Sequence, residues 1–329
     1  MTLPDAQSPE TASPLTDSDR LAGGLLGLLV GDALGVPYEF RHARDIPPAS
    51  LIEFTPPPDF ARAHHSVLPG TWSDDGAHAL CLLASLLDCG RLDLDDLGAR
   101  LLAWYEHGYM AVDGVVFDVG LTCGAAIRAI RAGTPAAQAG PSGQYDNGNG
   151  SLMRALPLAL WHRGSDQSLV HDAHQQSLPT HGHLRSQVCC ALYCLWARRV
   201  LAASNDAWGE AVASLRAIYA SMPDALEELE WWLRPDDAPE GNGSGYVVDS
   251  LRSARMVQDA STYGGVVRAA IALGNDTDTT ACIAGGIAGL RFGGQGIPER
   301  WRTQLRGSEL YQPLLEKLLH WSMTELIDE

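Results

Sequence analysis

Apolar residues recur along this chain at helical spacing, and strand-like alternation with β-branched enrichment is almost absent. From Leu21 to Gly35, small and apolar residues occupy every face, which is typical of a helix buried all round, and the stretch is too short and too glycine-rich for a membrane span. The same spacing predicts helices over residues 77–88, 94–106, 119–131, 152–161, 183–203, 207–219, 246–255, 263–273 and 279–292. The chain is therefore predicted to form an all-α fold, a compact orthogonal bundle of many helices.

The domain organisation is predicted to be simple. Residues 1–18 are rich in Pro, Ser, Thr and Asp and are expected to form a disordered tail, followed by a single domain over 19–329. Prolines keep residues 36–70 out of regular helix, and long ordered loops of this kind are often functional. Residues 236–245 are the best candidate linker, although a surface loop between helices explains them as well.

Composition excludes several classes of protein. Lys and Arg number 23 against 40 Asp and Glu, for a net charge of −17. This balance argues against non-specific binding to nucleic acid or to an anionic membrane, and an acidic surface opposes self-association, so we expect a monomer that does not bind membranes. An anionic small substrate remains compatible if metal ions and backbone N–H groups supply local positive charge.

Cysteine usage and the N-terminus indicate the compartment. The seven cysteines lie mostly in apolar segments and show no zinc-ligand spacing, which is typical of reduced core thiols. The first twenty residues are polar and acidic, with no apolar segment ahead of a cleavage site. We expect a cytoplasmic protein.

Two acidic clusters lie about two hundred residues apart, Ser73-Asp74-Asp75 and Asp276-Thr277-Asp278-Thr279. Each adjoins a predicted helix, so either one alone could be an N-terminal cap. If the fold brings them face to face, four aspartates and two hydroxyls make an all-oxygen site of the kind that Mg²⁺ or Mn²⁺ prefers.

Two polar turns stand between predicted helices. Residues 146–151 read Asp-Asn-Gly-Asn-Gly-Ser before Met153 and Arg154. Glycines let the backbone approach a ligand closely and free N–H groups at a helix start bind phosphate oxygens, but Asn-Gly followed by Ser is also ordinary turn chemistry. Thr180-His181-Gly182-His183 opens the next helix and favours capping or ligand contact over a metal site, because cysteines and carboxylates are lacking beside it.

These segments together resemble the ADP-ribosylglycohydrolase family, which includes the enzyme that reactivates ADP-ribosylated dinitrogenase reductase. The resemblance covers nearly the whole chain after the tail, and its last Asp-Thr-Asp-Thr motif is the most specific. The matching segments are residues 31–40, 72–75, 117–120, 147–154, 180–181, 273–280 and 283–289.

The resemblance implies an all-α fold around a central cleft with a dinuclear Mg²⁺ or Mn²⁺ centre. Carried over to this sequence, the implied metal ligands are Ser73, Asp74, Asp75, Asp276, Asp278 and Thr279. Ser73 stands where Thr is usual and keeps the hydroxyl, whereas Gly76 and His78 depart from the family pattern.

The implied reaction is hydrolysis of the bond at C1 of the ribose in ADP-ribosylated substrates, which releases ADP-ribose. Two catalytic residues are implied: Asp118, assisting water attack or stabilising the cationic sugar, and Glu39, acting as a gate of the metal site and a second-sphere base. Asp118 could instead be the N-cap of the helix predicted from Val119.

The substrate contacts implied by the same resemblance lie in the polar turns. Gly148, Asn149, Gly150 and Ser151 would cradle the diphosphate, and His181 would contact a phosphate or the ribose. Tyr263 or Tyr145 could stack on adenine, and either could equally be a packing residue.

The sequence does not determine which group is attached to the ribose of the substrate. ADP-ribose on arginine or a related protein conjugate is the leading substrate, while serine, polymer, acetyl ester and a modified nucleic-acid base remain alternatives. Asp113 could sense a cationic guanidinium or be a solvated loop acid. A second possible function is metal-dependent hydrolysis of another ADP-ribose conjugate or nucleotide. A third is binding of ADP-ribose without catalysis. The retention of four aspartates argues against this third function.

Overall fold

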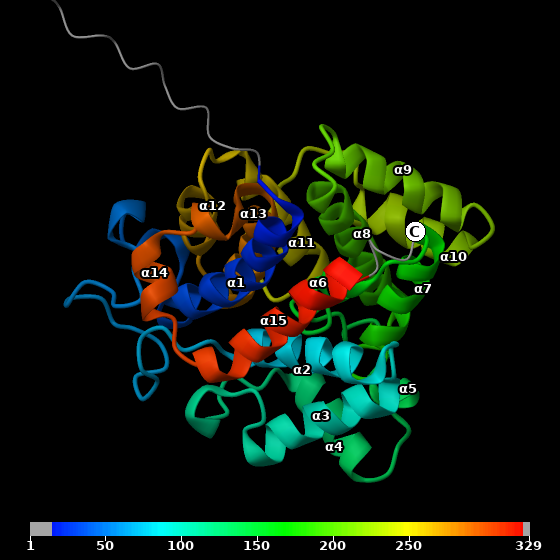
Figure 1. Ribbon diagram of the computed structural model, residues 1–329, viewed down its shortest axis with the longest axis horizontal. Coiled ribbons are helices and arrows are strands. Elements are labelled where there is room, and N and C mark those ends of the chain that lie inside the picture. Colours follow the sequence, from blue (N-terminus) through cyan, green and yellow to red (C-terminus); the bar gives the residue numbers. More distant parts are fainter. Residues whose placement is uncertain (1–14, 325–329) are drawn as a thin grey trace, which may run out of the picture.

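A computed structural model describes residues 15–324, and this part of the chain is all-α (Figure 1). It contains no β-strand, only two isolated bridges between loops, so the predicted fold class is confirmed. The fifteen α-helices are α1 (Asp17–Gly35), α2 (Asp74–Cys89), α3 (Leu94–His107), α4 (Leu121–Arg131), α5 (Ala136–Ala139), α6 (Leu156–Trp161), α7 (Asp166–Ser177), α8 (Leu184–Leu201), α9 (Ala207–Tyr219), α10 (Pro223–Glu227), α11 (Val247–Met256), α12 (Tyr263–Ile271), α13 (Thr277–Gly296), α14 (Glu299–Gln304) and α15 (Ser308–Thr324).

The central element is an antiparallel pair of helices, α1 and α13, whose backbones touch (Figure 1). A Cβ added at Gly27 would lie 2.4 Å from the carbonyl oxygen of Gly285, and one added at Gly31 would lie 2.1 Å from that of Ala281. Because no side chain fits at these distances, the glycines of α1 allow the close approach. Helix α1 has the length and composition of a membrane span, yet in this structure it is buried by the helices around it.

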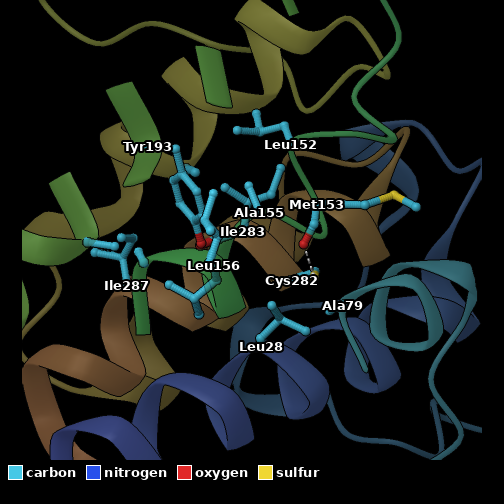
Figure 2. Close-up of a cluster of buried hydrophobic side chains, with 14 of the residues drawn as sticks. Leu28, Ala79, Leu152, Met153, Ala155, Leu156, Tyr193, Cys282, Ile283 and Ile287 are labelled. Carbon is cyan, nitrogen blue, oxygen red and sulfur yellow. Dashed lines mark hydrogen bonds between the residues drawn. The ribbon is translucent and has the colours of Figure 1, made fainter. Parts of the chain in front are cut away.

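The remaining helices cover this pair. Helix α2 lies beside α3, α8 packs between α7 and α9, and α15 lies across α1, α2 and α6 (Figure 1). Figure 2 shows part of the core, where residues of α1, α2, α8 and α13 surround residues 152–156. The Tyr193 hydroxyl of α8 donates to the carbonyl oxygen of Ile283 in α13 at 2.9 Å, and the Cys282 thiol lies 3.7 Å from the carbonyl oxygen of Met153. These contacts fix α8 and the turn before α6 against α13.

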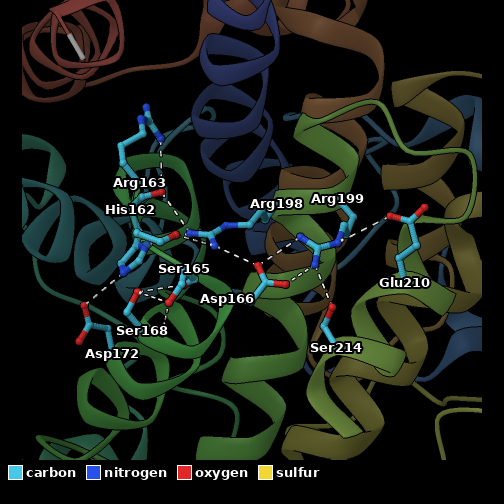
Figure 3. A network of polar contacts seen from close by, with 11 residues as sticks. His162, Arg163, Ser165, Asp166, Ser168, Asp172, Arg198, Arg199, Glu210 and Ser214 are labelled. Carbon is cyan, nitrogen blue, oxygen red and sulfur yellow. Dashed lines mark hydrogen bonds and ion pairs between the residues drawn. The ribbon is translucent and has the colours of Figure 1, made fainter. Parts of the chain in front are cut away.

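A polar network joins α7, α8 and α9 (Figure 3). Asp166, at the start of α7, accepts hydrogen bonds from Arg198 and Arg199 of α8, and Arg199 also donates to Ser214 of α9 at 2.9 Å. The acid at the helix start and the two arginines in the last turn of α8 are placed favourably for both helix dipoles. The network helps to hold α7, which supports the Thr180-His181 turn.

Several boundaries differ from the predictions. The helix predicted over 152–161 begins only at Leu156, because Pro157 suits the first turn of a helix and residues 152–155 form turns instead. The helix predicted from residue 119 begins at Leu121. The predicted tail reached residue 18, but Thr16 caps a helix that starts at Asp17; residues 1–14 lie outside the described part of the chain.

Five of the fifteen helices went unpredicted: α5, α7, α10, α14 and α15. Helices α5, α10 and α14 have only four to six residues, too few to show a helical period, and α7 is polar on more than one face. Helix α15 has apolar residues at helical spacing but contains Pro313, which argues against a helix in the sequence. The loop over residues 36–70 contains three single turns of 3₁₀-helix. The candidate linker at 236–245 is a packed surface loop: Gly243 and Gly245 accept backbone hydrogen bonds from Asp276 and Asn149 at 2.9 and 3.1 Å.

Candidate metal centre

The two acidic clusters meet at the N-termini of α2 and α13. Ser73 is the N-cap of α2, and its hydroxyl accepts a hydrogen bond from the Asp75 backbone N–H. Asp276 occupies the N-cap position of α13, but its side chain makes no capping bond there. The Thr279 hydroxyl donates to Asp75 Oδ1 at 3.2 Å, which joins two helices 204 residues apart. The close packing of α1 on α13 sets this meeting point, because the Thr277 hydroxyl also donates to the carbonyl oxygen of Gly35.

The carboxylates gather in two overlapping groups. Ligand oxygens of Asp32, Asp75 and Asp278 lie within 4.8 Å of one another, and so do those of Glu39, Asp276 and Asp278. Asp278 belongs to both groups, so the two groups are adjacent and share one carboxylate. Asp74 lines the adjoining cavity.

Buried oxygens without partners test whether cations fit here. Asp75 Oδ2 and Asp278 Oδ2 are buried and accept no hydrogen bond. Burial, followed by the neighbouring carboxylates, raises the pKa of both acids well above the usual value, and no ion pair in residues 15–324 involves either of them. A buried acceptor without a partner is costly, and like charges in one site repel. Hard divalent cations satisfy both demands, so this donor set fits them.

Asp32 is a member of this centre that the sequence reading missed. It is fully buried in α1 and accepts hydrogen bonds from the backbone N–H groups of Ser73 (2.9 Å) and Gly76 (2.7 Å). Burial raises its pKa to about 7, against the lowering effect of these two hydrogen bonds. An acid near the end of a helix that is otherwise small and apolar from Leu21 to Gly35 was the signal that could have revealed it.

Glu39 reaches the same centre from the loop that follows α1. Its carboxylate contacts His64 Nε2 at 2.5 Å, and the His64 ring packs beside Phe117. Burial and then the nearby Asp118 and Asp276 raise the pKa of Glu39 to about 10. Backbone hydrogen bonds on either side of Asn275 tie the loop to the start of α13 at 2.7 and 2.6 Å, so Glu39 is held where a cation could be bound.

Asp118 lines the cavity and does not cap a helix. The N-cap of α4 is Gly120, and Asp118 adopts a left-handed backbone conformation with φ 52°. Such a conformation is uncommon outside glycine and is often retained at functional sites. Burial and Asp276 raise the pKa of Asp118 to about 6.

Facing the acids, the other wall of the cavity is built from backbone and neutral side chains. The cavity has a volume of about 260 Å³, and Gly148, Gly150 and His181 line this wall. A Cβ at Gly150 would lie 2.5 Å from the Cys123 thiol and 2.9 Å from His181 Cε1, so only glycine fits there. Asn149 also lines the cavity, and its amide donates to Asp276 Oδ2 at 2.7 Å, which links the two walls.

Comparison with known proteins shows the family of this chain. The family model for ADP-ribosylglycohydrolases matches residues 13–326. This chain belongs to the ADP-ribosylglycohydrolase family. It is therefore a hydrolase of ADP-ribosyl bonds, as the resemblance implied.

Individual relatives carry more specific names. The chain is 30% identical over 320 residues to the ADP-ribosylarginine hydrolase Tri1 of Pseudomonas putida, covering 94% of this chain and 80% of that protein. It is 28% identical over 299 residues to the ADP-ribosyl-[dinitrogen reductase] glycohydrolase of Rhodospirillum rubrum, covering 87% and 90%. A solved ADP-ribosylglycohydrolase-related protein complex superposes with a TM-score of 0.73 at 29% identity, covering 93% of this chain and 99% of that chain.

Not every residue predicted for this ADP-ribosylglycohydrolase lies at the cavity. Tyr263 is fully buried and donates its hydroxyl hydrogen to the carbonyl oxygen of Gly27, so it cannot stack on a ligand. Ser151 is also fully buried, and its hydroxyl is hydrogen-bonded to the Ser177 hydroxyl at 2.9 Å. Asp113 forms an ion pair with Arg306 at 2.8 Å, away from the residues that line the cavity. Tyr145, the other candidate for stacking, is 94% exposed and lines a neighbouring cavity.

Proposed function

We propose that this ADP-ribosylglycohydrolase depends on divalent cations, two Mg²⁺ or Mn²⁺, and releases ADP-ribose from ADP-ribosylated arginine. The observation that carries the metal requirement is the pair of buried, unpartnered oxygens on Asp75 and Asp278. The names of two relatives, both ADP-ribosylarginine hydrolases, support arginine as the leaving group. A cytoplasmic location fits the seven cysteines, all free thiols.

The residues that would hold the cations come from three segments: Ser73, Asp74 and Asp75 before and in α2, Asp276, Asp278 and Thr279 at the start of α13, and Glu39 within reach of the second group. Bound divalent cations supply Lewis acidity, orient the ribose hydroxyls and lower the pKa of water. Asp32 would act behind the ligands, because its two backbone hydrogen bonds fix the first turn of α2.

Asp118 is the proposed general base. Its pKa of about 6 leaves it mostly ionised at neutral pH, yet well suited to accept a proton from an attacking water. A carboxylate in this position also stabilises positive charge that develops on the ribose as the C1 bond breaks. Glu39, held by His64, would assist from beside Asp118, because ligand atoms of these three residues lie within 4.8 Å of one another.

The diphosphate would lie on the neutral wall. Gly148, Gly150 and His181 line the cavity there and carry no carboxylate of their own, whereas the Asn149 N–H already donates to the Gly245 carbonyl oxygen. Next to it, a second cavity of about 490 Å³ shares Thr122, Gly148 and Gly245 with the first. It would take the adenosine half of the substrate.

Aromatic side chains around this second cavity suit a purine. Trp232 is stacked by the Arg185 guanidinium at 3.6 Å, and Tyr145 and Tyr246 stand on the same rim. Stacking on Tyr145 or on the Trp232–Arg185 pair replaces the role that the sequence gave to Tyr263.

Hydrolysis of defined conjugates tests the proposal. The enzyme is incubated with ADP-ribosyl-arginine, ADP-ribosyl-serine and O-acetyl-ADP-ribose in Mg²⁺, Mn²⁺ or EDTA, and free ADP-ribose is measured. We expect release from the arginine conjugate, and its loss in EDTA. Asp276→Asn should lose this activity while Asp45→Asn, at an exposed surface carboxylate, should keep it. Equal turnover in EDTA would reject the metal requirement, and preference for another conjugate would reject arginine.

A further inference from the structure

Arg154 is a fully buried cation that no carboxylate neutralises. Four of its five N–H donors are used, and all their acceptors are uncharged. Nε donates to Gln176 Oε1 at 3.1 Å and Nη2 to the Gln176 carbonyl at 2.6 Å. Nη1 donates to the Gly150 carbonyl at 3.1 Å and to the Thr180 hydroxyl at 2.6 Å. The guanidinium thus ties together the two turns that form the neutral wall of the cavity.

The bond from Arg154 determines what the Thr180 hydroxyl can do. An arginine is always a donor, so Thr180 Oγ1 must accept from it and keeps its own proton for another partner. His181 Nδ1 lies 2.9 Å from the same oxygen. The other neighbour is the Cys123 thiol, and sulfur is a weak acceptor compared with an imidazole nitrogen. The Thr180 proton therefore goes to His181 Nδ1.

His181 is held in the neutral form. Its side chain is buried, and burial together with the charge of Arg154 lowers its pKa to about 3. In a neutral imidazole one nitrogen is a donor and the other an acceptor. If Nδ1 accepts from Thr180, then Nε2 carries the hydrogen.

We propose that Arg154 and Thr180 are positioning residues that fix His181 as the Nε2–H tautomer, so that the ring presents a hydrogen-bond donor to an anionic group of the substrate. That this group is the diphosphate rests on the proposed function. The opposite tautomer would turn a lone pair toward the same anion and repel it.

The position of the ring supports this role. Nε2 faces the glycine turn, since a Cβ at Gly148 would lie 3.3 Å from it, and His181 lines the cavity. Its backbone is held twice by Ser177, whose carbonyl accepts from the His181 N–H at 2.8 Å and whose hydroxyl lies 2.8 Å from the His181 carbonyl. With backbone and Nδ1 both anchored, the ring has one orientation in which to meet a ligand.

The tautomer can be read directly by nitrogen NMR of histidine-labelled full-length enzyme, without metal or substrate. The His181 signals are assigned by their loss in His181→Gln. We expect a pyridine-like shift at Nδ1 and a pyrrole-like shift at Nε2, constant from about pH 5 to 8, a window above the lowered pKa. A pyrrole-like Nδ1, or a mixture of tautomers, in the unmodified protein would overturn the proposal. This measurement needs no enzymatic activity, so its failure is distinct from failure of the proposed function.

A pair of substitutions at Thr180 supplies the functional test. Thr180→Val keeps the shape of the side chain but removes the hydroxyl, whereas Thr180→Ser keeps the hydroxyl. We expect the valine variant to shift His181 toward a mixture of tautomers and to raise KM for the ADP-ribosyl substrate roughly tenfold, with little change in kcat. The serine variant should restore both. An unchanged tautomer in Thr180→Val, or a KM defect that serine does not rescue, would contradict the positioning role.

Discussion

The two walls of the cavity differ in charge and in how far their polar groups are hydrogen-bonded within the protein. The wall formed by α1, α2 and α13 is a set of carboxylates whose buried oxygens lack partners, as Asp75 Oδ2 and Asp278 Oδ2 show. On the facing wall, built from the Gly148–Gly150 turn and His181, the side-chain hydrogen bonds of Arg154 and Thr180 are made within the protein. The first wall has buried carboxylate oxygens without partners, whereas the side chains behind the second are hydrogen-bonded to one another; in the proposed function cations complete the first wall and the second receives an anion.

This difference assigns separate parts of the substrate to separate walls. Cations on the acidic wall would act at the ribose and its C1 bond, while the neutral wall would hold the phosphates and leave the chemistry alone. Substitutions on the two walls should therefore produce different kinetic signatures: loss of metal binding and kcat on one side, loss of substrate affinity on the other.

The largest effect is expected for Asp278→Asn, because Asp278 belongs to both carboxylate groups. Hydrolysis should fall by at least about 10³-fold, the scale set by losing metal-assisted chemistry. The thermal midpoint in EDTA should stay the same or rise, since a buried like charge has been removed. Kinetics and thermal unfolding of the same samples check this; a variant that is less stable and equally active would mean that Asp278 serves the fold.

Asp32→Asn should weaken cation binding at the acidic wall, because Asp32 fixes the first turn of α2. The asparagine amide can accept only at its oxygen, so one of the bonds from Ser73 N and Gly76 N is lost and the first turn of α2 shifts. We expect divalent-metal affinity to fall by about 10- to 100-fold, with substrate contacts on the neutral wall unaffected. Calorimetric titration with Mn²⁺ measures this, and unchanged affinity would limit Asp32 to a structural role.

How far the sequence predicts this site depends on the kind of residue. The aspartates of the two clusters could be singled out because they lie next to one another at predicted helix starts, and the structure brings the two clusters together; their roles as metal ligands stay a prediction. Asp32 was missed because its role depends on α2, forty residues away, approaching a buried face of α1.

Proximity in sequence also misled in two places. Tyr263 and Ser151 adjoin matched motifs, yet their side chains turn into the core against Gly27 and Ser177.

Helix α15 was not predicted because Pro313 argues against a helix there. In the structure, packing of α15 on α2 compensates for the proline.

Gly150→Ala should damage only the neutral wall. The added Cβ would lie 2.5 Å from the Cys123 thiol and displace the turn, so we expect KM to rise about tenfold while Mn²⁺ affinity stays constant. Gly120→Ala is the matched control, because a Cβ there meets nothing within 4 Å although the residue lines the same cavity. If both variants behave alike, the close fit around Gly150 is irrelevant to substrate binding.

The smallest effect should appear in the pH dependence of stability without metal. The pKa of Asp32 is raised to about 7 in the folded protein, whereas an unfolded aspartate titrates near 4. Between these values the folded state holds more protons than the unfolded state, so the free energy of unfolding falls as pH rises.

We therefore expect the thermal midpoint in EDTA to fall by a few degrees from about pH 5 to pH 8, and excess Mg²⁺ or Mn²⁺ to restore it most at the higher pH. Asp278→Asn is the comparison variant, since it removes one of the interacting acids and should flatten the dependence. A midpoint that rises with pH in EDTA would show that the carboxylates are already compensated within the protein.

The most direct test of the central claim is the stoichiometry of Mn²⁺ binding to the metal-free enzyme, followed by calorimetry and by electron paramagnetic resonance. We expect two ions per chain in the unmodified protein, with magnetic coupling between them because the two carboxylate groups share Asp278. Asp278→Asn should lose both ions or retain a single weak one. Failure of the unmodified protein to bind Mn²⁺, or equal binding by the two proteins, would contradict the assignment of the acidic wall as a metal centre.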